Sequence, residues 1–126
     1  MYIEKNNLDY KNLKWKDIIM NKYESIIIMK PSIDEDKKAE KLKEYKKFIK
    51  ELTNNMVEIK DLGKRSLAYD IKGNKEGFFA IFNFTGKPNH IIDLEKKYRA
   101  DEDTIKFITV RQEENFAEYE ESEEEM

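Results

Sequence analysis

The residue types that most often carry out chemistry in proteins are scarce in this sequence. It has no cysteine and a single histidine, His90, so it offers neither a thiolate nucleophile nor a cluster of imidazole or thiolate metal ligands. His90 is expected to be a surface or helix-capping residue. With four glycines, the chain could hardly form a phosphate-binding glycine-rich loop. The sequence therefore predicts that the protein is not an enzyme and has no catalytic residues, cofactor or metal site.

The charged residues are unevenly distributed and could bind a polyanion. Eight of the 27 acidic residues fall in positions 113–126, which contain no lysine or arginine. Residues 1–112 therefore carry 24 basic against 19 acidic side chains, although the whole chain has a net charge of −3. A basic body with an acidic tail can present one surface to nucleic acid. The excess is ordinary for this length, so it favours nucleic-acid binding only modestly.

An aromatic segment offers a second way of contacting nucleic acid. Residues 78–84 read Phe-Phe-Ala-Ile-Phe-Asn-Phe, and in a strand Phe78, Phe82 and Phe84 share one face while Phe79 lies on the other. One face must belong to the core, and aromatic side chains exposed on the other could stack on RNA bases. The segment lacks the basic, glycine-containing signature of RNA-recognition strands. Contact with a protein, or partial burial, is therefore the better interpretation.

The first half of the chain predicts a strand followed by a helix. Residues 23–29 form a nearly continuous apolar run, typical of a central strand, and the Lys-Pro pair after it ends the strand. Ser32 and Glu35 have the spacing of a capping box, which marks a helix start. Charged pairs such as Asp34 with Lys38 occupy one side of this helix, and apolar residues form a stripe on the other. The stripe consists of Ala39, Leu42, Tyr45, Phe48, Ile49 and Leu52.

The second half predicts two strands, a helix and a last strand. Residues 57–71 alternate between apolar and polar like a long strand, interrupted near Gly63, where a bulge or bend is expected. Residues 72–77 are interpreted as a turn, so this strand and the aromatic strand form a hairpin. A shorter helix begins near Pro88, and residues 105–110 form the final strand.

This order, β-α-β-β-α-β, predicts an α+β fold of the ferredoxin-like type, a four-stranded antiparallel sheet with two helices on one face. Right-handed crossovers would place the first and third strands at the centre. We expect residues 20–112 to form this domain, residues 1–19 to be an N-terminal extension and residues 113–126 to be a disordered acidic tail. The longest apolar run, residues 26–29, is too short for a membrane span.

Four stretches of the chain carry recognisable motifs. They are Lys22-Tyr23-Glu24 with the later Pro31-x-Ile33-Asp34, Gly63-Lys64-Arg65-Ser66-Leu67-Ala68-Tyr69-Asp70-Ile71, Gly77-Phe78-Phe79, and Ile105-Lys106-Phe107 with Val110-Arg111 and Phe116. Together they resemble the family of bacterial small-subunit ribosomal protein six, whose pattern at the second stretch is Gly-x-Arg-x-Leu-Ala-Tyr-Pro-Ile. Asp70 and Asn115 stand where that family has proline. Lys106 stands where arginine is usual, which keeps the charge but loses the planar fork that binds phosphate.

The resemblance implies a structural protein of the ribosome in the cytoplasm, without catalysis. Its partners would be the central domain of small-subunit (16S-type) rRNA and small-subunit ribosomal protein eighteen, with neither a membrane nor a small-molecule substrate. Carried over position by position, the RNA contacts would be Lys22, Tyr23, Arg111 and Phe116, supported by Arg65, Arg99 and Lys106. The alternative interpretation is a ferredoxin-like regulatory or dimerisation module that binds no RNA.

Residues 1–19 have no counterpart in that family, and two interpretations of them stay open. Translation could begin at Met20, where the family's usual N-terminus would lie. Alternatively, the extension could be an additional arm in which Trp15, flanked by Lys14 and Lys16, contacts RNA by stacking and by charge.

Overall fold

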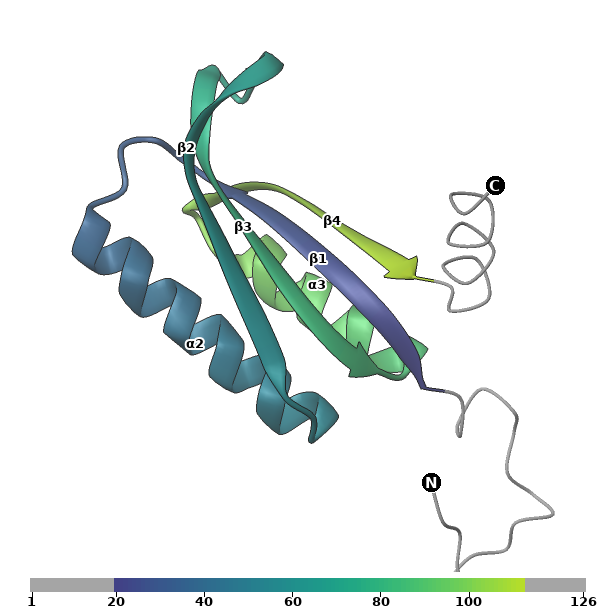
Figure 1. Ribbon diagram of the computed structural model, residues 1–126. Coiled ribbons are helices and arrows are strands. Elements are labelled where there is room, and N and C mark those ends of the chain that lie inside the picture. Colours follow the sequence, from purple (N-terminus) through teal and green to yellow (C-terminus); the bar gives the residue numbers. More distant parts are fainter. Residues whose placement is uncertain (1–19, 113–126) are drawn as a thin grey trace, which may run out of the picture.

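The computed structural model describes residues 20–112, and the predictions for residues 1–19 and 113–126 lie outside this part of the chain. The elements are β1 (Asn21–Met29), α2 (Glu35–Thr53), β2 (Val57–Ile71), β3 (Asn74–Gly86), α3 (Pro88–Ala100) and β4 (Thr104–Gln112). The strands form one antiparallel sheet in the order β2-β3-β1-β4, with both helices against one face (Figure 1). The first and third strands are central, so the predicted ferredoxin-like fold is confirmed. No helix within residues 20–112 is long and apolar enough to cross a membrane.

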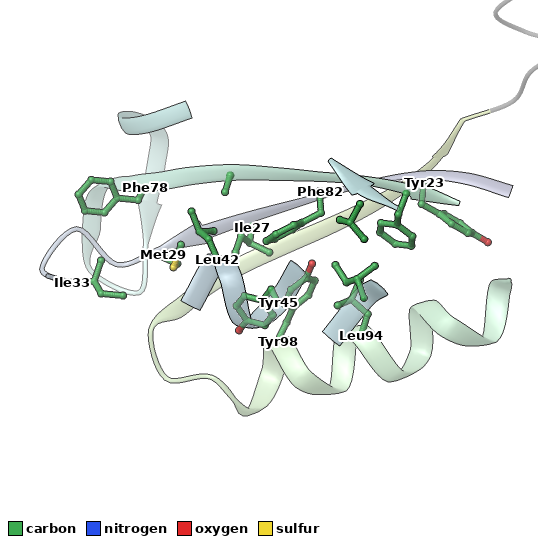
Figure 2. Close-up of a cluster of buried hydrophobic side chains, with 14 residues drawn as sticks. Tyr23, Ile27, Met29, Ile33, Leu42, Tyr45, Phe78, Phe82, Leu94 and Tyr98 are labelled. Atoms are coloured by element: carbon green, nitrogen blue, oxygen red, sulfur yellow. The ribbon is translucent and has the colours of Figure 1, made fainter. Parts of the chain in front are cut away.

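Alternation along the central strands decides which side chains meet the helices. Ile27 and Met29 of β1 and Ala80 and Phe82 of β3 are at most 1% exposed. They belong to one cluster with buried residues of both helices, such as Tyr98 of α3 (Figure 2). Because alternate residues of a strand share a face, the face of 78–84 that meets the helices is the one that carries Phe78, Phe82 and Phe84. The sequence had left the choice between the two faces open.

A polar pair lies inside this apolar core. Ser25 of β1 is fully buried, and its Oγ lies 2.8 Å from the Tyr98 hydroxyl and 2.9 Å from Thr109 Oγ1. Burial raises the pKa of Tyr98, so its hydroxyl keeps its proton and must hydrogen-bond inside the protein. Ser25 therefore joins α3 to the two strands β1 and β4.

Replacing Ser25 by alanine should lower the free energy of unfolding by about 1–2 kcal/mol, because the buried Tyr98 hydroxyl loses its partner. Denaturant unfolding with an unchanged m-value would measure this loss. Adding Tyr98→Phe to the alanine variant removes the stranded hydroxyl and should recover part of the loss. A double variant less stable than Ser25→Ala alone would contradict this account.

The turn between β2 and β3 is shorter than predicted. Lys72 and Gly73 alone connect the strands, with φ of 49° and 81°, values that suit a two-residue hairpin turn. The six-residue turn over 72–77 is therefore wrong, because β3 begins at Asn74, and Asn74, Glu76 and Gly77 pair with β2 across a register shift. The hairpin is correspondingly longer than expected.

The start of α2 also differs from the prediction. Asp34, not Ser32, is the N-cap residue, and no side chain forms the capping hydrogen bond. The reason lies in Ile33, whose side chain is buried. The backbone N–H of Ile33 donates to the Lys30 carbonyl and holds the chain before the helix in a turn. The predicted pairing of Lys38 with Asp34 is replaced by contacts to Glu35 and to a residue of β2.

Candidate nucleic-acid interface

The first basic group of the candidate interface lies where β1 begins and β4 ends. Antiparallel pairing sets Tyr23 opposite Arg111 and Lys22 opposite Gln112. The side chains of Lys22 and Arg111 are exposed. Tyr23 is only 7% exposed, and its ring packs 5.7 Å from that of Phe84, at one end of the core cluster (Figure 2). The structure thus brings Lys22 and Arg111 to one end of the sheet but places most of Tyr23 in the core.

An open hollow of about 830 Å³ adjoins this group. Three lysines line it, Lys22, Lys46 and Lys60, together with the carboxylates of Glu24 and Glu58. Sites that enclose small molecules are mostly apolar. A charged, open lining of this kind suits contact with a large polar partner instead.

The second basic group lies on the hairpin of β2 and β3. β1 pairs with β3 only as far as Phe78, so residues 64–76, here called the arm, project beyond the body of the sheet (Figure 1). Arg65 is exposed near the base of the arm. Farther along, the Lys106 ammonium of β4 lies 5.0 Å from the centre of the Tyr69 ring and donates a hydrogen bond to the Tyr69 hydroxyl. The structure therefore connects Lys106 with the arm that carries Arg65.

The remaining two predicted contacts join neither group. Arg99 lies in the helix layer on α3, with its guanidinium 5.5 Å from the centre of the Phe107 ring and 3.8 Å from a carboxylate oxygen of Glu95. Its side chain is 63% exposed. Phe116 lies outside the described residues. The predicted site is thus two separate basic groups and one distant arginine.

His90 caps a helix, as predicted for a surface or capping residue. Its Nδ1 accepts a hydrogen bond of 3.0 Å from the backbone N–H of Lys87, at the start of α3. Partial burial, and then the charge of Lys87, lower the pKa of His90, which keeps Nδ1 available as an acceptor at neutral pH. In the part of the chain that the structure covers, no three His, Cys, Asp or Glu side chains gather in a way that could hold a metal ion.

Tyr69 was missed as a candidate. Alternation along 57–71 assigns it to the buried side of the strand, yet it is 61% exposed, because the helices do not extend under the arm. The signal that could have identified Tyr69 is the length of the predicted strand that contains it. The predicted strand 57–71 has eight residues more than the predicted strand 23–29, and at about 3.3 Å per residue the excess must project from the sheet.

The family model described as Ribosomal protein S6 matches residues 22–111, from the start of β1 to the end of β4. The chain belongs to the ribosomal protein S6 family. Six of the seven predicted RNA contacts lie inside this match, and Phe116 lies beyond it.

Named relatives agree with this assignment to the S6 family. Small ribosomal subunit protein bS6 of Helicobacter acinonychis is 37% identical over 93 residues, which are 73% of this chain and 65% of that protein. The chain thus spans just under two thirds of that relative's length. The protein of the same name from Synechocystis sp. is 31% identical over 97 residues, 75% of this chain and 83% of that protein.

A solved structure of the same family has the same fold as this chain. The crystal structure of 30S ribosomal protein S6 from Thermotoga maritima has a TM-score of 0.72 and 26% sequence identity, and the similarity covers 86% of this chain and 100% of that one. The resemblance found in the sequence is confirmed. The S6 relatives carry the name of a ribosomal protein and not of an enzyme, which confirms the prediction that this chain is not an enzyme.

Proposed function

We propose that this S6-family protein is a structural component of the small ribosomal subunit in the cytoplasm, where it binds small-subunit rRNA beside small-subunit ribosomal protein eighteen. The observation that carries the proposal is the placement of exposed cations in two groups, at the end of the sheet and along the arm. Membership of the S6 family makes rRNA the polyanion that these groups would meet.

Charge supports RNA as the ligand. Residues 20–112 hold 20 basic and 16 acidic side chains, and the arm alone holds four cations against two carboxylates. Lysine and arginine at strand ends and in a projecting hairpin can reach phosphates without refolding, and each phosphate they neutralise releases counterions. Tyr69 adds an exposed ring that an unpaired base could contact.

The open face of the sheet suits the protein partner. Ile81, Ile26 and Ile108 lie side by side on β3, β1 and β4, and with Val110 they form an apolar row on the side away from the helices. Ile108 and Val110 are 48% and 49% exposed. Exposed apolar residues that adjoin one another are typical of protein contact sites, so protein eighteen would cover this row.

Replacing Lys22 and Arg111 together by glutamine should weaken binding to an rRNA central-domain transcript and flatten its salt dependence by about one unit of slope per residue. Fluorescence anisotropy over a series of potassium chloride concentrations measures the slope. The variant with Lys43→Gln and Lys47→Gln, two exposed lysines of α2, has the same net charge and should keep the wild-type slope. Equal slopes for the wild type and the Lys22/Arg111 variant would remove both residues from the site.

Capture from cell lysate with and without nuclease tests the function as a whole. A ribosomal component should sediment with small subunits and be recovered with protein eighteen. Recovery as a free homodimer, unaffected by nuclease, would support the regulatory module instead.

A further inference from the structure

The base of the arm is set by an irregular point in β2. It is the first of two places where the register with β3 shifts, and the second lies within the arm, between Ser66 and Ile71. The register between β2 and β3 shifts between Asp61 and Gly63, and Gly63 has a φ of +72°, which glycine adopts without strain. The Asp61 side chain stabilises this conformation, because its Oδ1 accepts a hydrogen bond of 3.0 Å from the Gly63 N–H. Arg65, just beyond, donates from Nε to the Leu62 carbonyl at 3.2 Å. The bulge thus positions Arg65 directly.

A buried lysine holds the other carboxylate oxygen of Asp61. Lys38 of α2 is only 6% exposed, and its ammonium lies 3.2 Å from Asp61 Oδ2 and 3.3 Å from Glu35 Oε2. It also lies 4.5 Å from the centre of the Phe78 ring in β3. A buried ammonium is costly unless it is paired. Its position is therefore strongly restricted, and it joins helix, bulge and central strand at one place.

We propose that Lys38 is a positioning residue for RNA binding: through Asp61 it fixes the bulge at Gly63 and hence the direction of the arm that presents Arg65. This inference rests on the proposed function for its RNA part. The arm needs such a support because, beyond Phe78, β3 pairs with β2 alone in the described sheet. The contact of Tyr69 with Lys106 restrains the far part of the arm, and Lys38 restrains its base.

The test compares Lys38→Met with Lys41→Met in the full-length protein. Methionine keeps an unbranched chain against Phe78 but cannot pair with Asp61. Lys41 is a matched control, since it lies on the same helix and contacts carboxylates, those of Asp101 and Asp103, that are not part of the arm. Backbone amide residual dipolar couplings report the direction of the arm, and anisotropy with the rRNA central-domain transcript reports affinity.

We expect Lys38→Met to change the couplings of residues 64–76 relative to the rest of the sheet and to weaken RNA binding by about three- to tenfold. Lys41→Met should change neither. Asp61→Asn removes the charge of the other partner in this ion pair and should reproduce the effect of Lys38→Met. The second variant keeps the inference testable if Lys38→Met does not fold. Arg65→Gln should cost less affinity in the Lys38→Met background than in the wild type, because Arg65 is then already misplaced.

The two readouts separate the positioning role from the function on which it rests. Unchanged arm couplings in both Lys38→Met and Asp61→Asn would overturn the inference, whatever the RNA measurement shows. Changed couplings with wild-type affinity would also overturn it. Changed couplings in a protein whose wild type binds no rRNA would uphold the role of Lys38 in directing the arm and reject the proposed function.

Discussion

Replacing Phe82 by alanine should lower the free energy of unfolding by about 3–5 kcal/mol, because the lost ring leaves a cavity that the packed core can only partly fill. Phe82 is completely buried. Its ring meets that of Tyr45 on α2 edge-on, with centres 6.0 Å apart, and Figure 2 shows it in the middle of the core cluster. Since a domain of this size has a total stability of about 5–15 kcal/mol, the variant should be near its unfolding midpoint at modest denaturant concentrations.

The neighbouring strand position Phe79 provides the control. Phe79 is the same residue type in the same strand, but it lies on the open face and is half-buried. Phe79→Ala should therefore lower the free energy of unfolding clearly less than Phe82→Ala does in the same denaturant titration. Equal losses would mean that both faces of β3 are packed alike, which contradicts a two-layer domain with one open face.

The parts of the fold that follow from local periodicity could be predicted from the sequence. A period of two in residues 78–84 placed Phe82 and Phe84 on one face and Phe79 on the other, without deciding which face belongs to the core. The handedness of crossovers placed β1 and β3 at the centre. Turn and cap details could not be predicted, because they depend on neighbours. Ile33 moves the helix start by inserting into the core. After a register shift between Ser66 and Ile71, β2 pairs with β3 again at Ile71 and Asn74, directly beside the chain reversal.

The candidate interface was less predictable than the fold. The basic positions came from a family resemblance, and that resemblance does not distinguish Arg99, in the helix layer, from Lys22 and Lys106, in the sheet. Lys38 is a further example. Its local spacing predicts a solvated helix residue, whereas its structural partner, Asp61, is 23 positions away. Ion pairs between distant segments become visible only when the chain is folded.

Replacing Asp103 by asparagine should lower the free energy of unfolding at neutral pH by about 2–3 kcal/mol. The Asp103 side chain is 5% exposed and contacts three ammonium groups, those of Lys30 at 2.8 Å, Lys37 at 3.2 Å and Lys41 at 3.2 Å. These contacts join the segment after β1, helix α2 and the start of β4. Asparagine keeps the shape but leaves the lysines without their shared carboxylate, so the loss is larger than that of an exposed ion pair.

The loss should depend on pH in a defined direction. Hydrogen bonding to Lys30, followed by Lys41 and Lys37, holds the pKa of Asp103 well below its usual range. A group whose pKa is lower in the folded than in the unfolded state stabilises the fold above its unfolded pKa, which is about 3.9 for aspartate, and loses this contribution as the pH falls through the folded value. The wild type should therefore lose its advantage over Asp103→Asn progressively below about pH 4.

Denaturant unfolding of both proteins from neutral pH into the acid range measures the difference. Asp93→Asn serves as the control, because Asp93 is an exposed aspartate on α3 and its replacement should cost little at any pH. Asp101 must stay ionised for the comparison to isolate Asp103. Burial raises the pKa of Asp101, but hydrogen bonds from Lys41 and Tyr45 outweigh this effect and keep the pKa below its usual range. A stability difference between wild type and Asp103→Asn that is constant from neutral to strongly acidic pH would show that the carboxylate charge does not hold these segments together.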